Sequence, residues 1–234
     1  QIRSRSEIDI SSDLSNGLEL YLPIIASPMD TVSEWKMARA MAKGGATAII
    51  HRYNSAAQQA SMVGDATTSG AKIVGAAIGV SGDYIKRAEM CLKAGATFLC
   101  ADVAHGHHIL MKEALAELRS KFGMDTHIMA GNVATLDGVN RLSDWGADSV
   151  RCNIGGGSIC STRIQTGHGL PGLQTIMDCA KTDRNVKIIA DGGIRNAGDI
   201  VKALAAGADA VMCGSLLSGT SETPGKVYTD EKGF

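Results

Sequence analysis

The sequence predicts an α/β fold, an eight-stranded (β/α)8 barrel, from three observations. Short apolar runs alternate with amphipathic stretches along the chain of 234 residues. The dipeptide Gly-Ala ends an amphipathic stretch and precedes an apolar run at residues 45, 70, 95, 146 and 207. Glycine is the usual end of a helix, and a continuous apolar run is typical of a parallel strand buried on both faces. Eight such units in a little over two hundred residues fit a barrel better than an open doubly wound sheet.

Eight apolar runs are the expected strands, and seven helical stretches separate them. In chain order the strands are Ile24–Ser27, Thr47–His51, Val74–Gly79, Phe98–Val103, His127–Asn132, Ser149–Ile154, Lys187–Asp191 and Ala210–Gly214. Ser33, Thr135 and Asn196 stand where helix N-caps are expected, because their side chains accept hydrogen bonds from the free N–H groups of a first turn. No linker or low-complexity segment divides the chain, so we expect one domain over residues 1–234.

The last part of the chain breaks the alternation. Residues 215–234 follow the eighth strand, are polar and turn-rich, and predict no eighth helix. We therefore expect a barrel whose C-terminal helix is missing from this chain.

Composition narrows the class of protein. A net charge of −1 and an aromatic content of 4% give no reason to expect a nucleic-acid or anionic-membrane partner. No apolar run approaches the roughly 18 residues of a membrane span, and no signal peptide is visible. The six cysteines form no C-x-x-C pair, and most lie in apolar runs, where a reduced thiol behaves as a small hydrophobe. These features favour a cytoplasmic protein.

Polar residues and glycines gather where the expected strands end. Active sites of such barrels lie at the carboxyl ends of the strands. The segments there are Ser27–Asp30, Asp102–His107, Gly131-Asn132, Gly155–Thr162, Asp191–Gly193 and Gly214-Ser215. The sequence therefore predicts one site at this rim of the barrel.

The loop Gly155–Arg163 carries the strongest chemical signal. Its three consecutive glycines can turn backbone N–H groups toward an anion, Ser158 adds a hydroxyl, and Cys160 follows on the same loop. A phosphate site beside a thiol suggests covalent chemistry on a phosphorylated substrate. The alternative is a surface loop with a chance cysteine.

The seventh and eighth strands supply the usual phosphate position of such barrels. N–H groups of Gly193, Gly214 and Ser215 are expected to bind phosphate with Ser158, and Asp191 to accept hydrogen bonds from ribose hydroxyls. The alternatives are plain turns for the glycines and a helix cap for Asp191.

Three further features remain open at this point. His105, His107 and His108 resemble a metal cluster, but no carboxylate or cysteine stands at matching spacing, so solvated side chains are the better interpretation. Asp102 ends an apolar strand, and a buried carboxylate requires a partner. Arg151, in mid-strand, fits an ion pair inside the barrel and a ligand contact equally well.

The motifs resemble those of the inosine monophosphate dehydrogenase and guanosine monophosphate reductase superfamily along nearly the whole chain. The segments that carry the resemblance are Ser27–Val32, Asp102–His107, Ala130–Val133, Gly157–Arg163, Ala190–Arg195 and Val211–Leu216. They occur in the right order, each at the end of an expected strand.

The resemblance implies roles for individual residues. Cys160 is similar to the nucleophile that attacks C2 of the purine, and Thr162 to the threonine that helps to activate water or the leaving group. The positions matching the nucleotide-binding set are Ser27, Met29, Ser158, Asp191, Gly192, Gly193, Gly214 and Ser215. Those matching the nicotinamide-facing set are Asp102, Asn132, Arg151 and Gly155. Carbonyl groups of Gly155, Gly157 and Cys160 match a potassium site. Asn153 departs from the family, which commonly has glycine there.

The resemblance favours the dehydrogenase, which oxidises IMP with NAD, over the reductase, which converts GMP to IMP and ammonia with NADPH. The segments Asp191–Arg195 and Gly219–Gly225 look more like the dehydrogenase, whereas Thr166–Gly169 resembles the reductase. The stretch from His51 to Val74 leaves no room for the two-module (CBS) regulatory insert that dehydrogenases usually carry. The mobile flap with the catalytic base would lie beyond Phe234. The family implies a homotetramer. Two other hypotheses are a barrel that binds a purine nucleotide without turnover, and a different phosphate-binding barrel such as a flavin-dependent synthase.

Overall fold

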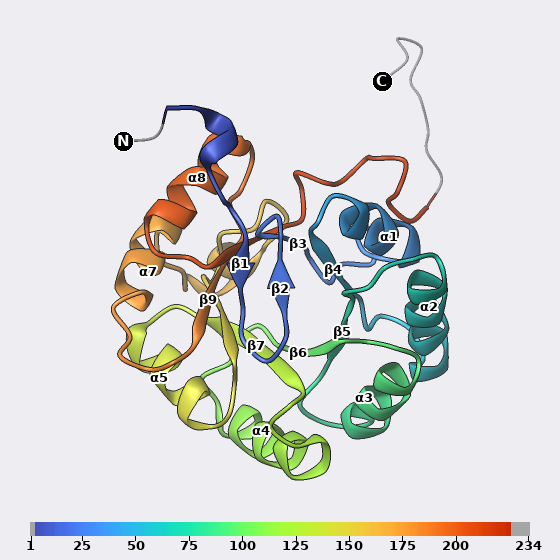
Figure 1. Ribbon diagram of the computed structural model, residues 1–234. Coiled ribbons are helices and arrows are strands. Elements are labelled where there is room, and N and C mark those ends of the chain that lie inside the picture. The colour runs from blue at the N-terminus through green and yellow to red at the C-terminus, as the bar shows by residue number, and fades with distance from the viewer. Residues whose placement is uncertain (1–2, 226–234) are drawn as a thin grey trace.

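Eight parallel strands close into a barrel in the computed structural model, which describes residues 3–225 (Figure 1). The strands, each hydrogen-bonded to the next, are β3 (Ile24–Ala26), β4 (Thr47–Ile50), β5 (Gly75–Ile78), β6 (Phe98–Asp102), β7 (His127–Val133), β8 (Ser149–Cys152), β9 (Lys187–Asp191) and β10 (Ala210–Cys213). Pairing of β10 with β3 closes the ring. The predicted (β/α)8 fold class is confirmed, and each expected strand differs from the observed one by at most two residues at either end.

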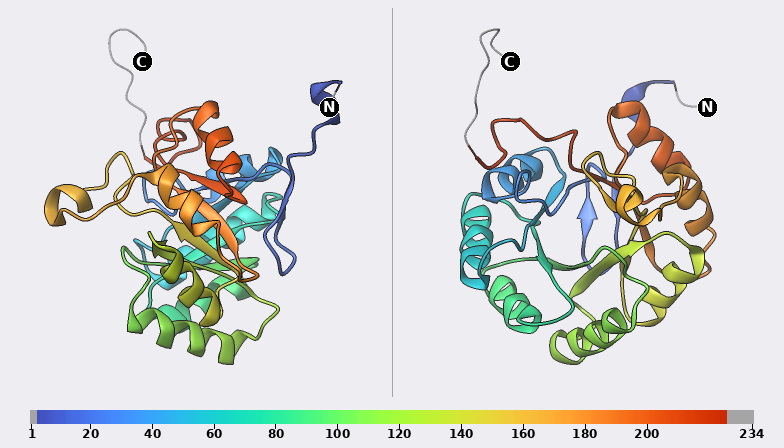
Figure 2. Two further views of the ribbon diagram at one scale, coloured as in Figure 1. Left: turned by 90° about the vertical axis from the view of Figure 1, so that its left-hand side faces the viewer. Right: turned by 180° about the vertical axis from the view of Figure 1, so that it is seen from behind.

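Helices surround the barrel on its outside (Figures 1 and 2). They are α1 (Trp35–Lys43), α2 (Ala56–Thr68), α3 (Tyr84–Lys93), α4 (Ile109–Phe122), α5 (Leu136–Asp144), α7 (Gly172–Cys179) and α8 (Ala197–Ala205), with a short α6 (Thr162–Thr166) and a 3-10 turn, Arg5–Glu7. Apolar faces of the helices and outward strand residues form one buried cluster between the two layers. No helix in the described part of the chain is both long and apolar enough to span a membrane.

Two of the three expected helix caps are confirmed. Thr135 accepts a hydrogen bond from Gly138 N–H, and Asn196 from Asp199 N–H. The expectation for Ser33 is wrong, because α1 begins after Glu34 and the buried Ser33 hydroxyl has no hydrogen-bond partner. The reason is that Ser33 still belongs to the preceding turn, where its N–H donates to Met29 O.

A hairpin of β1 (Ser12–Asp13) and β2 (Glu19–Leu20) closes one end of the barrel, a feature that the sequence did not predict. Leu14, Leu18 and Leu20 join the interior cluster of strand side chains that includes Phe98. The carbonyl of Ser15 lies 3.2 Å from the ring of His127, which begins β7, so the hairpin covers the amino ends of the strands. The cavities lined by the candidate site residues open at the opposite, carboxyl end.

The segment after β10 forms turns as far as Gly225, and no helix occurs there among the described residues. The expectation for the eighth helix also concerns residues 226–234, which lie outside the described part of the chain.

Candidate active site

Two adjoining cavities open at the carboxyl ends of the strands. The smaller, of about 80 Å³, lies where β3, β9 and β10 end. All eight residues expected to bind the nucleotide line it: Ser27, Met29, Ser158, Asp191, Gly192, Gly193, Gly214 and Ser215. A Cβ on Gly214 would lie 2.9 Å from the sulfur of Met29, so a larger residue at this point would displace the Met29 side chain. The cavity is small, and serines, an aspartate and glycines contribute to its lining together with apolar side chains.

The larger cavity, of about 480 Å³, is a cleft across the centre of the barrel mouth. It shares Ser27, Met29 and Asp191 with the smaller cavity. The residues expected at the nucleophile, the nicotinamide face and the potassium site all line it: Cys160, Thr162, Asp102, Asn132, Arg151, Gly155 and Gly157. The fold thus brings together residues that lie far apart in the sequence.

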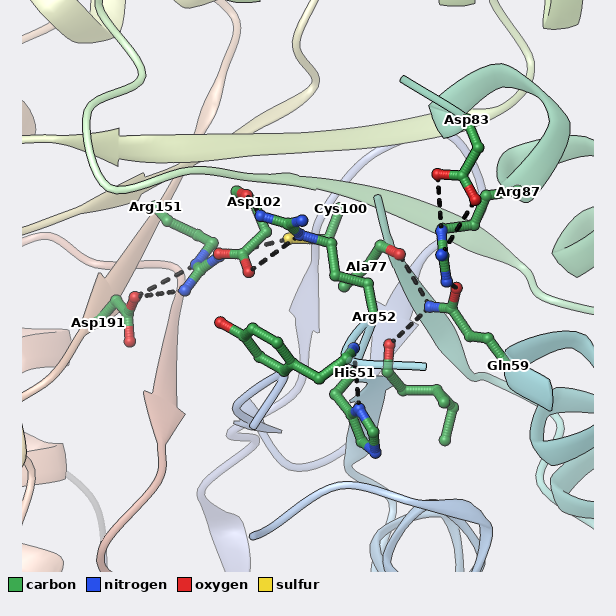
Figure 3. Close-up of polar contacts among 12 residues, drawn as sticks. His51, Arg52, Gln59, Ala77, Asp83, Arg87, Cys100, Asp102, Arg151 and Asp191 are labelled. Atoms are coloured by element: carbon green, nitrogen blue, oxygen red, sulfur yellow. Dashed lines mark hydrogen bonds and ion pairs between the residues drawn. The ribbon is translucent and has the colours of Figure 1, made fainter. Parts of the chain in front are cut away.

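A buried ion network forms the floor of the cleft (Figure 3). The Arg151 guanidinium donates to the carboxylate of Asp102, and at 2.8 Å to that of Asp191. Asn132 Nδ2 also donates to Asp191 Oδ2, at 2.8 Å. Arg151 is therefore an ion-pair residue that also lines the cleft, so the two interpretations of its role are compatible. Asp191 is not a helix cap, because Asn196 caps α8.

Burial and the neighbouring charges shift the pKa of Arg151 in opposite directions. Burial alone would lower the pKa of its guanidinium, but the carboxylates of Asp191 and Asp102 outweigh burial and raise that pKa. Arg151 stays charged, and one cation is shared between two carboxylates. In the described structure no hydrogen bond reaches Asp191 Oδ1, so this oxygen is available to a ligand hydroxyl.

Cys160 differs from the other five cysteines, which are buried. It is half-buried, and its sulfur lies 3.3 Å from the hydroxyl oxygen of Thr162. Hydrogen bonding to Thr162, through its side chain and then its backbone, lowers the pKa of the Cys160 thiol, with a smaller contribution from the charge of Arg163. By contrast, burial raises the pKa of Cys213 to about 12. Because the thiolate is the reactive form, Cys160 is the candidate nucleophile.

The structure explains only in part why Asn153 stands where the family commonly has glycine. Its φ is +116°, a conformation that suits glycine and that other side chains rarely adopt. The side chain occupies the space between two glycines, since a Cβ on Gly156 or Gly172 would lie 2.3 or 2.8 Å from its Nδ2. Its Oδ1 is buried and has no hydrogen-bond partner. A buried oxygen without a hydrogen-bond partner destabilises the folded chain.

No group of three or more His, Cys, Asp or Glu side chains that could hold a metal ion occurs among residues 3–225, the histidines near β6 included. His108 instead accepts a hydrogen bond from Leu110 N–H at the start of α4. His107 lies 3.8 Å from the carboxylate of Asp137.

Sequence reasoning missed two residues that line the cleft, Arg52 and Tyr53. They follow β4, and Arg52 donates a 3.0 Å hydrogen bond to the carbonyl of Asp102. The rule that selected the other candidates, a polar residue directly after a strand, would also have found them.

Comparisons with known proteins identify the family of the chain. Residues 1–233 match the model of a family described as the IMP dehydrogenase / GMP reductase domain. The inosine-5'-monophosphate dehydrogenase of Nitrosopumilus maritimus is 48% identical over 162 residues, 68% of this chain and 34% of that protein. The enzyme of the same name from Cryptosporidium parvum is 36% identical over 264 residues, 94% of this chain and 65% of that protein. A GMP reductase of Leishmania donovani is 47% identical over 165 residues, 69% of this chain and 34% of that protein.

The matched part thus spans between one third and two thirds of the length of these relatives. Since the family model covers almost the whole chain, the chain belongs to the IMP dehydrogenase / GMP reductase domain family.

Proposed function

We propose that this chain forms the catalytic barrel of an IMP dehydrogenase, which oxidises IMP to XMP with NAD through a covalent Cys160 thioimidate. The observation that carries the proposal is the position of Cys160. Its thiol, with a lowered pKa, lies in a cleft that joins a phosphate-sized cavity on one side and the Asp102–Arg151–Asp191 network on the other. A nucleotide whose phosphate occupies the smaller cavity would extend its base toward the sulfur.

The chain's residues then have defined tasks. N–H groups of Gly193, Gly214 and Ser215 hold the phosphate, and the free oxygen of Asp191 accepts a ribose hydroxyl. The Cys160 thiolate forms a bond to C2 of the purine, which makes C2 tetrahedral and lets its hydrogen leave with two electrons. Water then adds to the resulting thioimidate and displaces the thiolate, which yields XMP and restores Cys160. The Thr162 hydroxyl, 3.3 Å from the sulfur, is placed to orient that water.

A nicotinamide dinucleotide would supply the hydride acceptor, and the residues present fit it. Asp102, Asn132, Arg151 and Gly155 line the part of the cleft beside Cys160. The dinucleotide is NAD under this proposal and NADP under the reductase alternative.

A potassium ion would be held by the carbonyls of Gly155, Gly157 and Cys160. Cys160 N–H donates to Gly157 O at 3.1 Å, which closes a turn over residues 157–160, and Gly155 lies two residues before that turn. A carbonyl oxygen has two lone pairs, so Gly157 O can still bind a cation. The ion would hold the reactive loop in one conformation.

GMP reductase is the second candidate, supported by the similarity to the Leishmania donovani protein and by Thr166–Gly169. In that reaction the same thiolate displaces ammonia from C2 and the adduct accepts hydride from NADPH. A barrel that binds a purine nucleotide without turnover is a third candidate. We further propose one barrel domain over residues 1–234 without a regulatory insert, a cytoplasmic location and a homotetramer.

Two measurements test the proposal. A purine 5'-monophosphate bearing a halogen at C2 should add one nucleotide mass to the chain, and Cys160→Ala should abolish the addition, whereas Cys213→Ala should not. Equal labelling of the Cys160→Ala chain would refute the assigned nucleophile. Absorbance at 340 nm then separates the candidates: it rises with IMP, NAD and potassium for the dehydrogenase, falls with GMP and NADPH for the reductase, and stays flat in both mixtures for a binding barrel.

A further inference from the structure

We propose that Arg163 is a positioning residue for Cys160: the stem of its side chain holds together the two ends of the loop that carries the nucleophile, and its guanidinium charge favours the thiolate. The inference rests on the proposed function, because it deepens the role of the same thiol. It adds a residue that lines neither the phosphate-sized cavity nor the cleft.

The methylene stem of Arg163 packs against the backbone at both ends of the loop of residues 155–169. A Cβ on Gly155, shortly after β8, would lie 2.5 Å from Arg163 Cγ, and a Cβ on Gly169, shortly before α7, would lie equally close to the same atom. The helix that carries Arg163, α6, has only five residues and stands away from the barrel, as the left view of Figure 2 shows. The stem therefore holds the base of a loop whose middle projects from the fold.

Arg163 acts from the side of the loop opposite the cleft. It lines a third cavity, of about 310 Å³, that lies between α7 and α8. Gly156 lines both this cavity and the cleft, so the run of glycines separates the two. A substrate in the cleft would not contact Arg163, and any effect of Arg163 on the reaction has to pass through the loop.

The charge of Arg163 acts on the sulfur of Cys160. Hydrogen bonding to Thr162 is the largest cause of the lowered pKa of the Cys160 thiol, and the Gly155 backbone and the Arg163 charge lower that pKa further. Gly155 is also the residue against which the Arg163 stem packs, so the stem supports one of these hydrogen bonds. The charged side chains that line the cleft are equal in number of each sign: Arg52, Arg151, Asp102 and Asp191. Arg163 is thus the cation that favours the reactive thiolate.

The experiment compares Arg163→Lys, Arg163→Met and Arg163→Ala, which keep charge and stem, the stem alone, and neither. Alkylation of Cys160 by iodoacetamide at a series of pH values reports the thiolate, because so small a reagent needs no alignment. Below the midpoint of the profile, Arg163→Met and Arg163→Ala should react about threefold more slowly than the wild-type chain, as expected for loss of one screened unit charge, and added salt should reduce the difference. Arg163→Lys should keep the wild-type profile, and all four chains should react equally fast above the midpoint.

Labelling by a purine 5'-monophosphate with a halogen at C2, at a pH above every midpoint, reports the alignment of the sulfur with C2. Arg163→Ala should lower the rate at saturating nucleotide about tenfold without changing the concentration that gives half that rate, whereas Arg163→Met should stay near the wild-type rate. Gly169→Ala should lower the rate in the same way, since its Cβ would displace the stem. Lys202→Met is the matched control, because Lys202 lines the same cavity from α8.

Wild-type labelling rates in both Arg163→Ala and Gly169→Ala would overturn the positioning role, and Gly169→Ala decides alone if circular dichroism shows that Arg163→Ala does not fold. An unchanged alkylation profile in Arg163→Met would overturn the role of the charge. So would a Lys202→Met chain with the same change, because any cation at this cavity would then act on the thiol. Absence of nucleotide labelling in the wild-type chain would instead refute the proposed function, and the alkylation profiles would still decide whether Arg163 acts on Cys160.

Discussion

Replacing Arg151 with Met should cost more stability than most single substitutions in this fold. The side chain is 8% exposed and is the cation for two carboxylates, whose side chains are 16% and 13% exposed. Met keeps the apolar stem but leaves Asp191 without a charged partner among the described residues, and leaves Asp102 with only the Arg52 guanidinium, whose Nε lies 4.0 Å away. Breaking a buried ion pair in this way costs about 3–5 kcal/mol. For a chain of this size that corresponds to a fall in Tm of about 6–20 °C.

The assay is urea unfolding followed by circular dichroism, with Arg151→Met compared with the triple variant that adds Asp102→Asn and Asp191→Asn. If uncompensated charge is the cause, the neutral amides should recover most of the lost free energy, although three sites have changed. A loss below about 1 kcal/mol, the value for an exposed pair, would refute the reasoning. So would a triple variant no more stable than Arg151→Met, because the loss would then come from packing.

Three further predictions concern single residues. Iodoacetamide should react with Cys160 before the other cysteines, and because the pKa of Cys160 is lowered, its reaction should remain fast to a lower pH than that of an ordinary thiol. Thr162→Val should raise the pH at which the rate of this reaction declines. Identical pH–rate profiles for the two chains would contradict the role of Thr162. Asn153→Gly should raise Tm, since it relieves positive φ and removes an unpaired buried oxygen, whereas Asn153→Ala keeps the strain and should gain less. Burial lowers the pKa of His127 in the folded chain, so as the pH falls below about 6.5 the unfolded chain takes up a proton at this histidine before the folded chain does. The free energy of unfolding should therefore decrease below that pH, by up to about 1.4 kcal/mol per pH unit. His127→Gln should make this decrease smaller.

The order of strands and the residues that line the smaller cavity were predictable because the signals are local. A buried parallel strand is a continuous apolar run, and the residue after it lies at the rim wherever the barrel closes. Ser27, Ser158 and Gly214 could therefore be placed without knowing any distance. The predicted roles of these residues in binding a nucleotide stay predictions.

Pairings between distant residues were not predictable in the same way. Arg151 could be described only as an ion-pair or ligand residue, because its partners Asp102 and Asp191 lie 49 and 40 residues away. The hairpin that closes the barrel was missed because its strands have two residues each, too few for any periodicity. Ser33 was misassigned because capping depends on where the preceding turn ends.

The position of the loop Gly155–Arg163 depends on Asn153, the residue that follows β8. Its N–H donates to Val133 O and its carbonyl accepts from Asn132 Nδ2, so its backbone is fixed to β7. Beyond it, glycines let the chain turn back so that Cys160 faces the cleft, and the Asn153 side chain fills the space against Gly156 and Gly172. The sulfur is therefore positioned by a turn whose base is fixed and whose tip is half-exposed. Under the proposed function, Cys160 would need both conditions to form and break a bond to a bound base: a fixed starting position, and freedom for its sulfur to move toward C2 and back.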